Sequence, residues 1–423
     1  MTRFIRRATM AALLSTASAF AVTIVIGDHS AMAAAAKKEE GPTLRPALGK
    51  LLNDTIKDTD AVKTAKNDAE KAKIFADALA KVKEADAIKD KTPFEEYQVA
   101  KFLGFIAINQ PMPDYTAAAA AYNRQVASGG APEAEKAGAY KVAMRLNYQE
   151  KNFPEAIKDG VALQMLEPFD DTEYLVMIQS YYSTNDFTDA ADMAKKEIAA
   201  KTAAGMKPTE DVLGLLLNSQ IKTNNEAGAR EALDQLAMIS NKPDVWGQVM
   251  DFALGTKGIT DHQLLNLYRL GLLTGTMKDT DFAAMATIDL QNGLPKEAIA
   301  VLMKGNKTGE LLTQANGLAA RDEQTLPALA AEAAKHTDGE VDVKLGESYY
   351  TYGRYDDAIA ALQRGIQKGG LKDMADAETT LGIALLAAGK KDQAVAEFDK
   401  AAAAPTAAAQ IAHVWTLYGK RSV

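Results

Sequence analysis

The 423-residue chain contains no cysteine. This absence excludes disulfide bonds, thiolate metal sites, a cysteine nucleophile and a bacterial lipoprotein anchor. Proline and glycine, with 13 and 29 residues, are too few for a fibrous protein, and a hydrophobic content of 47% is too high for a disordered one. The net charge of −8 comes without a basic cluster, so binding of nucleic acid or of a lipid surface has no electrostatic support. The composition indicates a globular protein.

The first 33 residues have the pattern of an export signal. Arg3, Arg6 and Arg7 precede an apolar stretch, Ala8–Gly27, and Ala31–Ala33 has the small-x-small form that signal peptidase cleaves. Removing these 33 residues, which carry three Arg and one Asp, leaves 390 residues with a net charge of −10. A retained anchor is the alternative, since about 20 apolar residues can span a bilayer. We expect cleavage, a periplasmic or secreted protein, and no membrane span in the mature chain.

The remaining sequence has the period of helices. Apolar residues recur at i, i+3 and i+4 almost to the end, and strict alternation over a strand's length is hard to find. Thr92–Glu95 combines a capping Thr, a Pro at the first helical position and a Glu three residues after the cap. Ala131–Glu133 and Lys207–Glu210 are weaker helix starts. Short polar turns separate helices at Gln149–Asn152, Ser183–Asp186 and Tyr352–Arg354. These patterns predict an all-α fold.

Two segments of the chain recur at a fixed distance. One pattern, shifted by 34 residues, matches Tyr148, Phe153 and Ala156 with Tyr182, Phe187 and Ala190. The other, shifted by 36 residues, matches Leu345, Gly346, Gly353 and Ala358 with Leu381, Gly382, Gly389 and Ala394. A helical hairpin cannot bury its apolar face alone, so the repeats must stack on one another.

These residues resemble the tetratricopeptide repeat (TPR). The best matches to that motif are Leu345, Gly346, Tyr349, Gly353, Tyr355, Ala358 and Leu362, followed by Leu381, Gly382, Gly389, Ala394, Phe398, Ala401 and Pro405. The resemblance covers roughly residues 95–415 and is strong only over 341–405. It implies an α-solenoid of stacked helical hairpins, similar to exported repeat proteins of Gram-negative bacteria. A break between two sub-stacks is expected, if anywhere, at Gly255–Gly258 or Lys304–Gly309.

The matches divide the chain into five segments. Residues 1–33 are the signal peptide, and 34–92 are a linker with a helical cap that lacks the motif. Divergent TPR-like repeats occupy 93–240, and weakly matching helical repeats occupy 241–340. Residues 341–415 hold the two well-matched TPR units and a C-terminal helix.

No catalytic residue, metal ligand or cofactor site is predicted. The histidines of the mature chain are far apart and lack a second ligand at helical spacing: His262, His336 and His413. Ser219–Lys222 and Lys307–Gly309 match strings found in penicillin-recognising enzymes, but the sheet that this chemistry requires is not predicted. Glu347 and Ser348 are similar to the catalytic pair of lytic transglycosylases. They lie inside the best repeat, and the glycine-rich cleft sequence of those enzymes is missing.

The TPR resemblance implies a concave groove lined by the first helix of each hairpin. The groove positions are Lys141, Arg145, Tyr148 and Gln149 in one hairpin, Gln179, Tyr182 and Ser183 in the next, and Glu347 and Tyr350 near the C-terminus. Aromatic and guanidinium groups dominate binding energy at interfaces, so these side chains predict a site for a protein or peptide partner. The alternative is that the tyrosines only pack against the next hairpin.

The sequence therefore predicts a non-enzymatic scaffold without cofactors, in the bacterial periplasm, that binds a protein or peptide partner. Two alternatives remain. One is a cell-wall hydrolase or carbohydrate-binding protein, with Glu347 or Ser219 as the only candidate centres. The other is a self-assembling structural spacer, and self-association into a homo-oligomer stays open.

Overall fold

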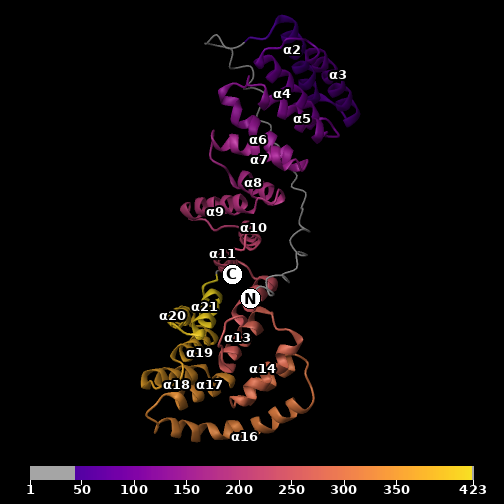
Figure 1. The fold of residues 1–423 in the computed structure, drawn as a ribbon. Helices are drawn as coiled ribbons and strands as arrows, with labels where there is room; N and C mark the ends of the chain where they lie inside the picture. Colours follow the sequence, from indigo (N-terminus) through magenta and orange to yellow (C-terminus); the bar gives the residue numbers. More distant parts are fainter. Residues whose placement is uncertain (1–42, 422–423) are drawn as a thin grey trace. The chain divides into compact units, whose positions relative to one another are not determined.

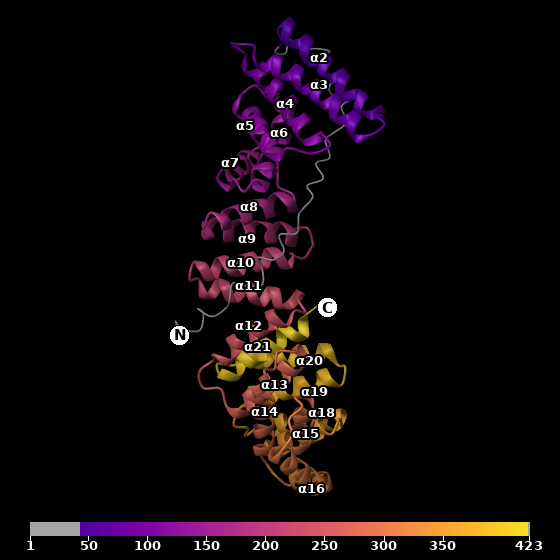
Figure 2. The same ribbon diagram turned by 90° about the vertical axis from the view of Figure 1, so that its right-hand side faces the viewer.

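The computed structural model describes residues 43–421, and the predicted signal peptide lies outside these residues (Figure 1). Within them the chain forms α-helices and one 3-10 turn and contains no strand, which confirms the all-α prediction. Successive helices pair as hairpins (Figure 2). The chain divides after Lys207 into two compact units, whose described parts are residues 43–207 and 208–421. This division lies outside both segments where the sequence allowed a break.

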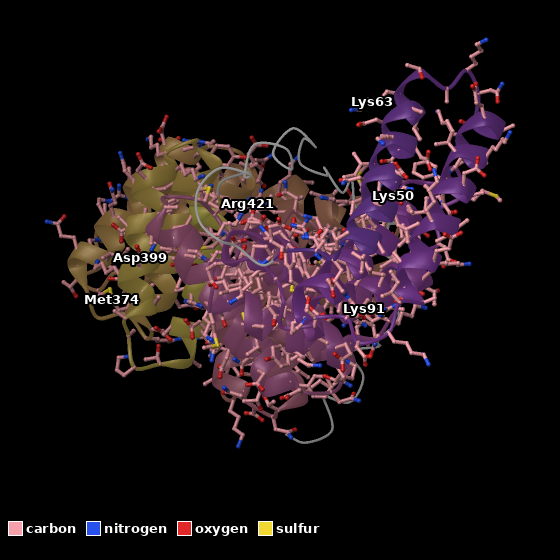
Figure 3. All side chains as sticks on the ribbon, turned by 90° about the horizontal axis from the view of Figure 1, so that it is seen from above. Lys50, Lys63, Lys91, Met374, Asp399 and Arg421 are labelled. Atoms are coloured by element: carbon pink, nitrogen blue, oxygen red, sulfur yellow. The ribbon has the colours of Figure 1, made fainter. Side chains whose placement is uncertain are left out.

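The first unit contains eight α-helices within residues 43–207. In chain order they are α2 (Pro46–Ala61), α3 (Asp68–Asp86), α4 (Pro93–Asn109), α5 (Tyr115–Ala127), α6 (Glu133–Gln149), α7 (Phe153–Gln164), α8 (Asp171–Ser183) and α9 (Phe187–Ala203). The 3-10 turn η2 (Val62–Thr64) joins α2 to α3. The first hairpin, which lacks the repeat motif, carries exposed lysines such as Lys50 and Lys63 (Figure 3). Its apolar face packs on α4 through Leu48, Phe75 and Val99.

The second unit contains twelve α-helices within residues 208–421. They are α10 (Glu210–Lys222), α11 (Glu226–Ile239), α12 (Pro243–Leu254), α13 (Asp261–Thr274), α14 (Asp279–Gln291), α15 (Pro295–Lys304), α16 (Glu310–Ala333), α17 (Glu340–Thr351), α18 (Tyr355–Lys368), α19 (Met374–Ala387), α20 (Lys391–Ala402) and α21 (Ala407–Lys420). No helix in the described part of the chain is long and apolar enough to cross a membrane.

The helix starts follow the capping residues of the sequence. Thr92 accepts a hydrogen bond from the Glu95 backbone N–H, and the Glu95 side chain accepts one from the Thr92 N–H, so the predicted capping box forms. Thr209 caps α10 in the same way through the Val212 N–H. Glu133 begins α6 directly after Pro132. All three predicted helix starts are confirmed.

Six hairpin turns within the described residues share one backbone geometry. In each of them, the second residue after the first helix has a positive φ. Its N–H donates a hydrogen bond to the carbonyl three residues earlier, as from Asn185 to Tyr182. This left-handed conformation favours glycine or asparagine, which explains the turn residues Asn185, Asn224, Gly293, Gly353 and Gly389. Lys151 adopts the same conformation, with φ 59°. A shared turn is what fixes the repeat period.

The weakly matching region departs from the hairpin pattern. α16 is a single helix of 24 residues, and Pro327 lies inside it. No residue between its ends has a positive φ, so no turn interrupts the helix. Gly255–Gly258 and Lys304–Gly309 are connections between helices inside the second unit.

The last helix returns to the beginning of its unit. α21 packs on its neighbour α20 and also on α11, α12 and α13, from which it is separated by more than a hundred residues of chain (Figure 2). Trp415 lies at the centre of this contact, fully buried and stacked on Phe398 at 5.5 Å between ring centroids. The end of the second unit thus packs against helices near its beginning.

The small residues of the repeat motif permit close helix contacts. A Cβ atom on Gly382 would lie 2.3 Å from the Phe398 ring, which Trp415 holds in place. We expect Gly382→Ala to lower the free energy of unfolding by about 1–3 kcal/mol, because the buried ring cannot move away. Gly317, in the middle of α16, has open space around its Cα.

The matched control is therefore Gly317→Ala. It is expected to raise stability by about 0.5–1 kcal/mol, since alanine restricts the unfolded chain and favours the helix. Urea denaturation measures both variants. Equal effects of the two substitutions would contradict the close contact at Gly382.

Candidate functional site

The predicted binding residues of the first unit lie on α6 and α8, which pack against each other. Four of them meet across this contact. Lys141 and Arg145 on α6 both form ion pairs with Glu173 on α8, and the Lys141 Nζ–Glu173 Oε2 distance is 3.6 Å. The Tyr148 hydroxyl donates a hydrogen bond to the Gln179 side chain. These four predicted residues therefore lie together across the contact between α6 and α8.

This face of α6 and α8 is partly open. The side chains of Lys141 and Arg145 are 29% and 20% exposed, whereas Glu173 is fully buried beneath them. Gln149 and Ser183, the last residues of the two helices, are exposed. We call the surface formed by Lys141, Arg145, Tyr148, Gln149, Gln179, Tyr182 and Ser183 the α6–α8 face.

The tyrosines of the repeat close the hairpin turns. In each case the ring packs against an aromatic residue five positions later, with centroid distances of 5.9, 5.1 and 5.9 Å for Tyr148–Phe153, Tyr182–Phe187 and Tyr350–Tyr355. These contacts stabilise the hairpin without any partner. Packing within the hairpin, the alternative role of these tyrosines, therefore accounts for their recurrence in part. The Tyr148 hydroxyl still reaches the α6–α8 face.

The remaining predicted residues, Glu347 and Tyr350 on α17, do not lie on an open face. Glu347 is 4% exposed, and burial raises the pKa of Tyr350. α13 lies over this part of the second unit and contacts both α19 and α21. The positions that the TPR resemblance assigns to a partner are covered by the chain's own helix.

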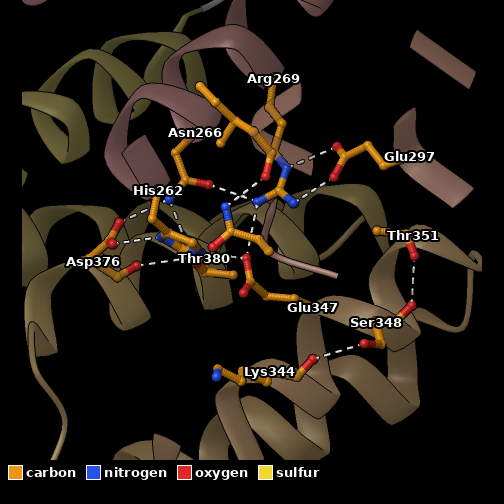
Figure 4. Close-up of polar contacts among 12 residues, drawn as sticks. His262, Asn266, Arg269, Glu297, Lys344, Glu347, Ser348, Thr351, Asp376 and Thr380 are labelled. Atoms are coloured by element: carbon orange, nitrogen blue, oxygen red, sulfur yellow. Dashed lines mark hydrogen bonds and ion pairs between the residues drawn. The ribbon is translucent and has the colours of Figure 1, made fainter. Parts of the chain in front are cut away.

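α13 presents three polar side chains on one face, at positions i, i+4 and i+7. His262 lies between two carboxylates, with Nε2 2.6 Å from Glu347 and Nδ1 2.6 Å from Asp376 (Figure 4). The Asn266 amide donates to Asp376 at 3.0 Å and to Thr380 at 3.3 Å. Two helices distant in sequence, α17 and α19, are thus joined through α13.

The third of these side chains, Arg269, is 3% exposed. Its guanidinium forms two hydrogen bonds with Glu297, at 2.9 and 2.6 Å, and lies 3.5 Å from Glu347 (Figure 4). It also donates to Asn266 at 2.9 Å and lies over the Tyr350 ring, 5.2 Å from the centroid. We call the group His262, Asn266, Arg269, Glu297, Glu347, Asp376 and Thr380 the buried polar cluster.

The two central charges of the cluster stabilise each other. Burial opposes protonation of His262, but the carboxylates of Glu347 and Asp376 outweigh it and raise its pKa to about 10. Burial also opposes ionisation of Glu347, yet His262 and Arg269 hold its pKa below the ordinary value. The imidazolium and the carboxylate therefore both stay charged at neutral pH.

Asp289 on α14 lies close to this cluster and behaves differently. Its side chain is fully buried, and neither carboxyl oxygen has a hydrogen-bond partner within the described residues. Burial, with the charge of Glu297 added, raises its pKa to about 9. Asp289 is consequently a neutral carboxylic acid at pH 7.

The residues that imitate enzyme motifs are not placed in a cleft. Ser219 is fully buried in α10, and its Oγ has no hydrogen-bond partner in the described part of the chain. Lys307 pairs with Asp279 at 2.6 Å. Glu347 is engaged in the polar cluster, and the Ser348 hydroxyl donates to its own helix at the Lys344 carbonyl. Within residues 43–421 no group of His, Asp and Glu is arranged to hold a metal ion.

A cavity opens beside the polar cluster. Its volume is about 490 Å³, and its walls come from α13, α17, α18, α19, α20 and α21. The lining residues are Leu273, Tyr350, Tyr355, Ile383, Leu386, Ala387, Lys391, Trp415, Tyr418, Gly419 and Arg421. Tyr350 and Trp415 separate it from the cluster, since the Tyr350 ring contacts Arg269 and the Trp415 indole donates to the Asn266 carbonyl at 3.1 Å.

No protein-family model matches the sequence, and a search of curated proteins finds no match. Three similar solved structures are helical repeat proteins. A tetratricopeptide repeat protein from Parabacteroides merdae ATCC 43184 has 11% identity over 68% of this chain and 100% of its own, with a TM-score of 0.22. The TPR domain of P58(IPK) has 16% identity over 88% of this chain and 97% of its own, with a TM-score of 0.21. Yeast Tom70 has 11% identity over 88% of this chain and 96% of its own, with a TM-score of 0.19. TM-scores this low carry no functional argument.

The sequence did not predict the cluster or the cavity. One signal for the cluster was present, because α13 is rich in leucine and yet repeats polar residues at His262, Asn266 and Arg269. A polar stripe at helical spacing within an apolar helix indicates buried polar partners when the helix lies inside the protein. The cavity has no such signal, since its lining comes from six helices.

Proposed function

We propose that this protein is a non-enzymatic scaffold that binds a protein or peptide partner through the α6–α8 face. One observation carries the proposal. Within the described residues of the first unit, α6 contacts only α4, α5, α7 and α8, the helices next to it in the hairpin stack. In the second unit α13 covers the corresponding helices, because it packs on α19 and its His262 and Arg269 side chains reach Glu347 on α17. The α6–α8 face is thus the predicted groove surface that no helix of its own unit occupies.

The second unit supports the proposal by an internal example. There, the first-helix residues Glu347 and Asp376 recognise the polar side of α13 through His262 and Asn266. The same kind of surface on α6 and α8 offers an amide, aromatic rings and two cations that are paired with Glu167, Asp170 and Glu173. Such a surface suits a partner segment with polar and aromatic groups. The compartment that we propose, the periplasm, rests on the sequence of residues 1–33 alone.

Site-specific photo-crosslinking in cells tests the proposal. A photoreactive amino acid is placed at Gln149 or at Ser183, whose exposed side chains can be replaced without disturbing packing. Lys196, exposed on the second helix α9, serves as the matched control position. We expect the same partner to be crosslinked from both test positions in the envelope fraction, and not from the control.

The other outcomes separate the alternatives. A product of twice the chain's mass from Gln149 and Ser183 would favour the self-assembling spacer. Identical products from all three positions, or none from the two test positions, would contradict partner binding on the α6–α8 face. Once a partner is known, Tyr182→Ala is expected to weaken its binding about fivefold or more while the helix content stays unchanged.

A further inference from the structure

The cavity of the second unit combines an aromatic lining with positive charge. Tyr350, Tyr355, Trp415 and Tyr418 contribute rings, and the apolar side chains of Leu273, Ile383 and Leu386 complete the wall. A volume of about 490 Å³ lies within the usual range for small-molecule sites. Buried aromatic surface of this kind favours a flat apolar group over a flexible polar one.

The charges that line the cavity have one sign. Lys391 and Arg421 are its only charged lining residues, and neither has an acidic partner among the described residues. The Lys391 Nζ lies 3.0 Å from the Arg421 carbonyl, and the Arg421 guanidinium lies over the Tyr418 ring at 3.9 Å. The Arg421 guanidinium also donates to the Asn241 side chain at 3.3 Å, so each cation has only neutral partners among the described residues. Arg269, beyond Tyr350, is already neutralised by Glu297 and Glu347.

The polar groups of the lining are available to a ligand. The hydroxyls of Tyr350, Tyr355 and Tyr418 form no hydrogen bond within the part of the chain that the structure describes, although all three rings are held by aromatic contacts. The Trp415 indole N–H, by contrast, is committed to the Asn266 carbonyl. Hydroxyl donors beside two cations suit the oxygens of an anion.

We propose that this cavity binds a small aromatic carboxylate, with the ring among Tyr350, Tyr355 and Tyr418 and the carboxylate toward Lys391 and Arg421. The two positive side chains repel a cationic ligand, and a neutral aromatic molecule offers them no opposite charge. The site belongs to the second unit and does not depend on partner binding by the α6–α8 face.

Isothermal titration calorimetry with 2-naphthoate tests the site, and 2-naphthalenemethanol is the neutral counterpart of the same shape. We expect the full chain to bind the carboxylate about tenfold more tightly than the alcohol. Lys391→Gln and Arg421→Gln should each weaken 2-naphthoate severalfold and leave the alcohol unchanged. Leu273 lies at the rim of the cavity and is 54% exposed. Leu273→Asp should weaken binding of 2-naphthoate about tenfold, because the two negative charges repel each other.

The matched control is Lys420→Gln, which removes an equivalent charge from α21 outside the lining. It should leave 2-naphthoate binding unchanged. The two tryptophans of the chain give two indole N–H signals in an NMR spectrum, and only that of Trp415 belongs to the cavity lining. A shift of the Trp415 signal on adding 2-naphthoate supports the site. No binding, equal binding of acid and alcohol, or equal loss in Lys420→Gln would each overturn the proposal.

Discussion

Arg269→Ala is expected to lower the free energy of unfolding of the second unit by about 3–5 kcal/mol. The guanidinium is 3% exposed and pairs with Glu297 and Glu347, whose side chains are 10% and 5% exposed. Removing it leaves Glu297 without its main cation and Glu347 with His262 alone, close to the buried acid Asp289. Alanine also leaves a space beside the Tyr350 ring, which loses its cation–π contact.

Urea denaturation, monitored by tryptophan fluorescence, measures this effect in the second unit. Both tryptophans, Trp246 and Trp415, belong to the second unit, so the emission reports its unfolding alone. Arg354→Ala is the control, because Arg354 pairs with Asp357 at 2.7 Å on an exposed helix end. Its unfolding midpoint should fall far less than that of Arg269→Ala, since the exposed ion pair and the contact with the Tyr349 ring at 4.3 Å add little stability. Similar midpoints for the two variants would show that the Arg269 ion pairs are not buried.

The hairpins were predictable because their signals are local. Six turns are set by a residue with positive φ, the second residue after the first helix, as at Asn185 and Gly353. The aromatic pair Tyr182–Phe187 spans five residues and recurs with the period of the repeat. Backbone propensity, capping and short-range packing all act within one hairpin, so one sequence contains them completely.

The buried polar cluster could not be predicted because its partners are distant in the chain. His262 and Asp376 are 114 residues apart, and Arg269 and Glu347 are 78 residues apart. The polar stripe on α13 shows that this helix needs polar partners and does not identify them. Their meeting depends on α21 packing back on α11, α12 and α13, which no local pattern encodes.

The two sets of predicted binding residues illustrate the same difference. Glu347 and Arg145 occupy corresponding positions of the repeat in their first helices. Arg145 lies on the α6–α8 face, whereas α13 buries Glu347. A repeat motif therefore predicts which side of a hairpin faces the groove, while the path of the rest of the chain decides whether that groove is open.

The second unit is expected to lose stability as the pH rises from 7 to 10. His262 has a folded pKa of about 10 against an ordinary value of 6.5, so its contribution is full below pH 6.5 and disappears as the pH rises through 10. Asp289 acts in the same direction. Its folded pKa is about 9 against 3.8, so the folded state holds the proton more tightly and stability falls with pH across that interval.

Together these two groups should lower the free energy of unfolding by on the order of a few kcal/mol between pH 7 and 10. Asp289→Asn removes one titration and should make the protein more stable at pH 9 and the pH dependence shallower. His262→Gln should lower stability at pH 7, where the ion pairs with Glu347 and Asp376 are lost, and flatten the alkaline part of the curve. Urea midpoints from tryptophan fluorescence at each pH measure both effects. His336→Gln, at an exposed site, is the control and should leave the dependence of stability on pH unchanged. If Asp289→Asn and His262→Gln also leave it unchanged, the charges assigned to His262 and Asp289 are wrong.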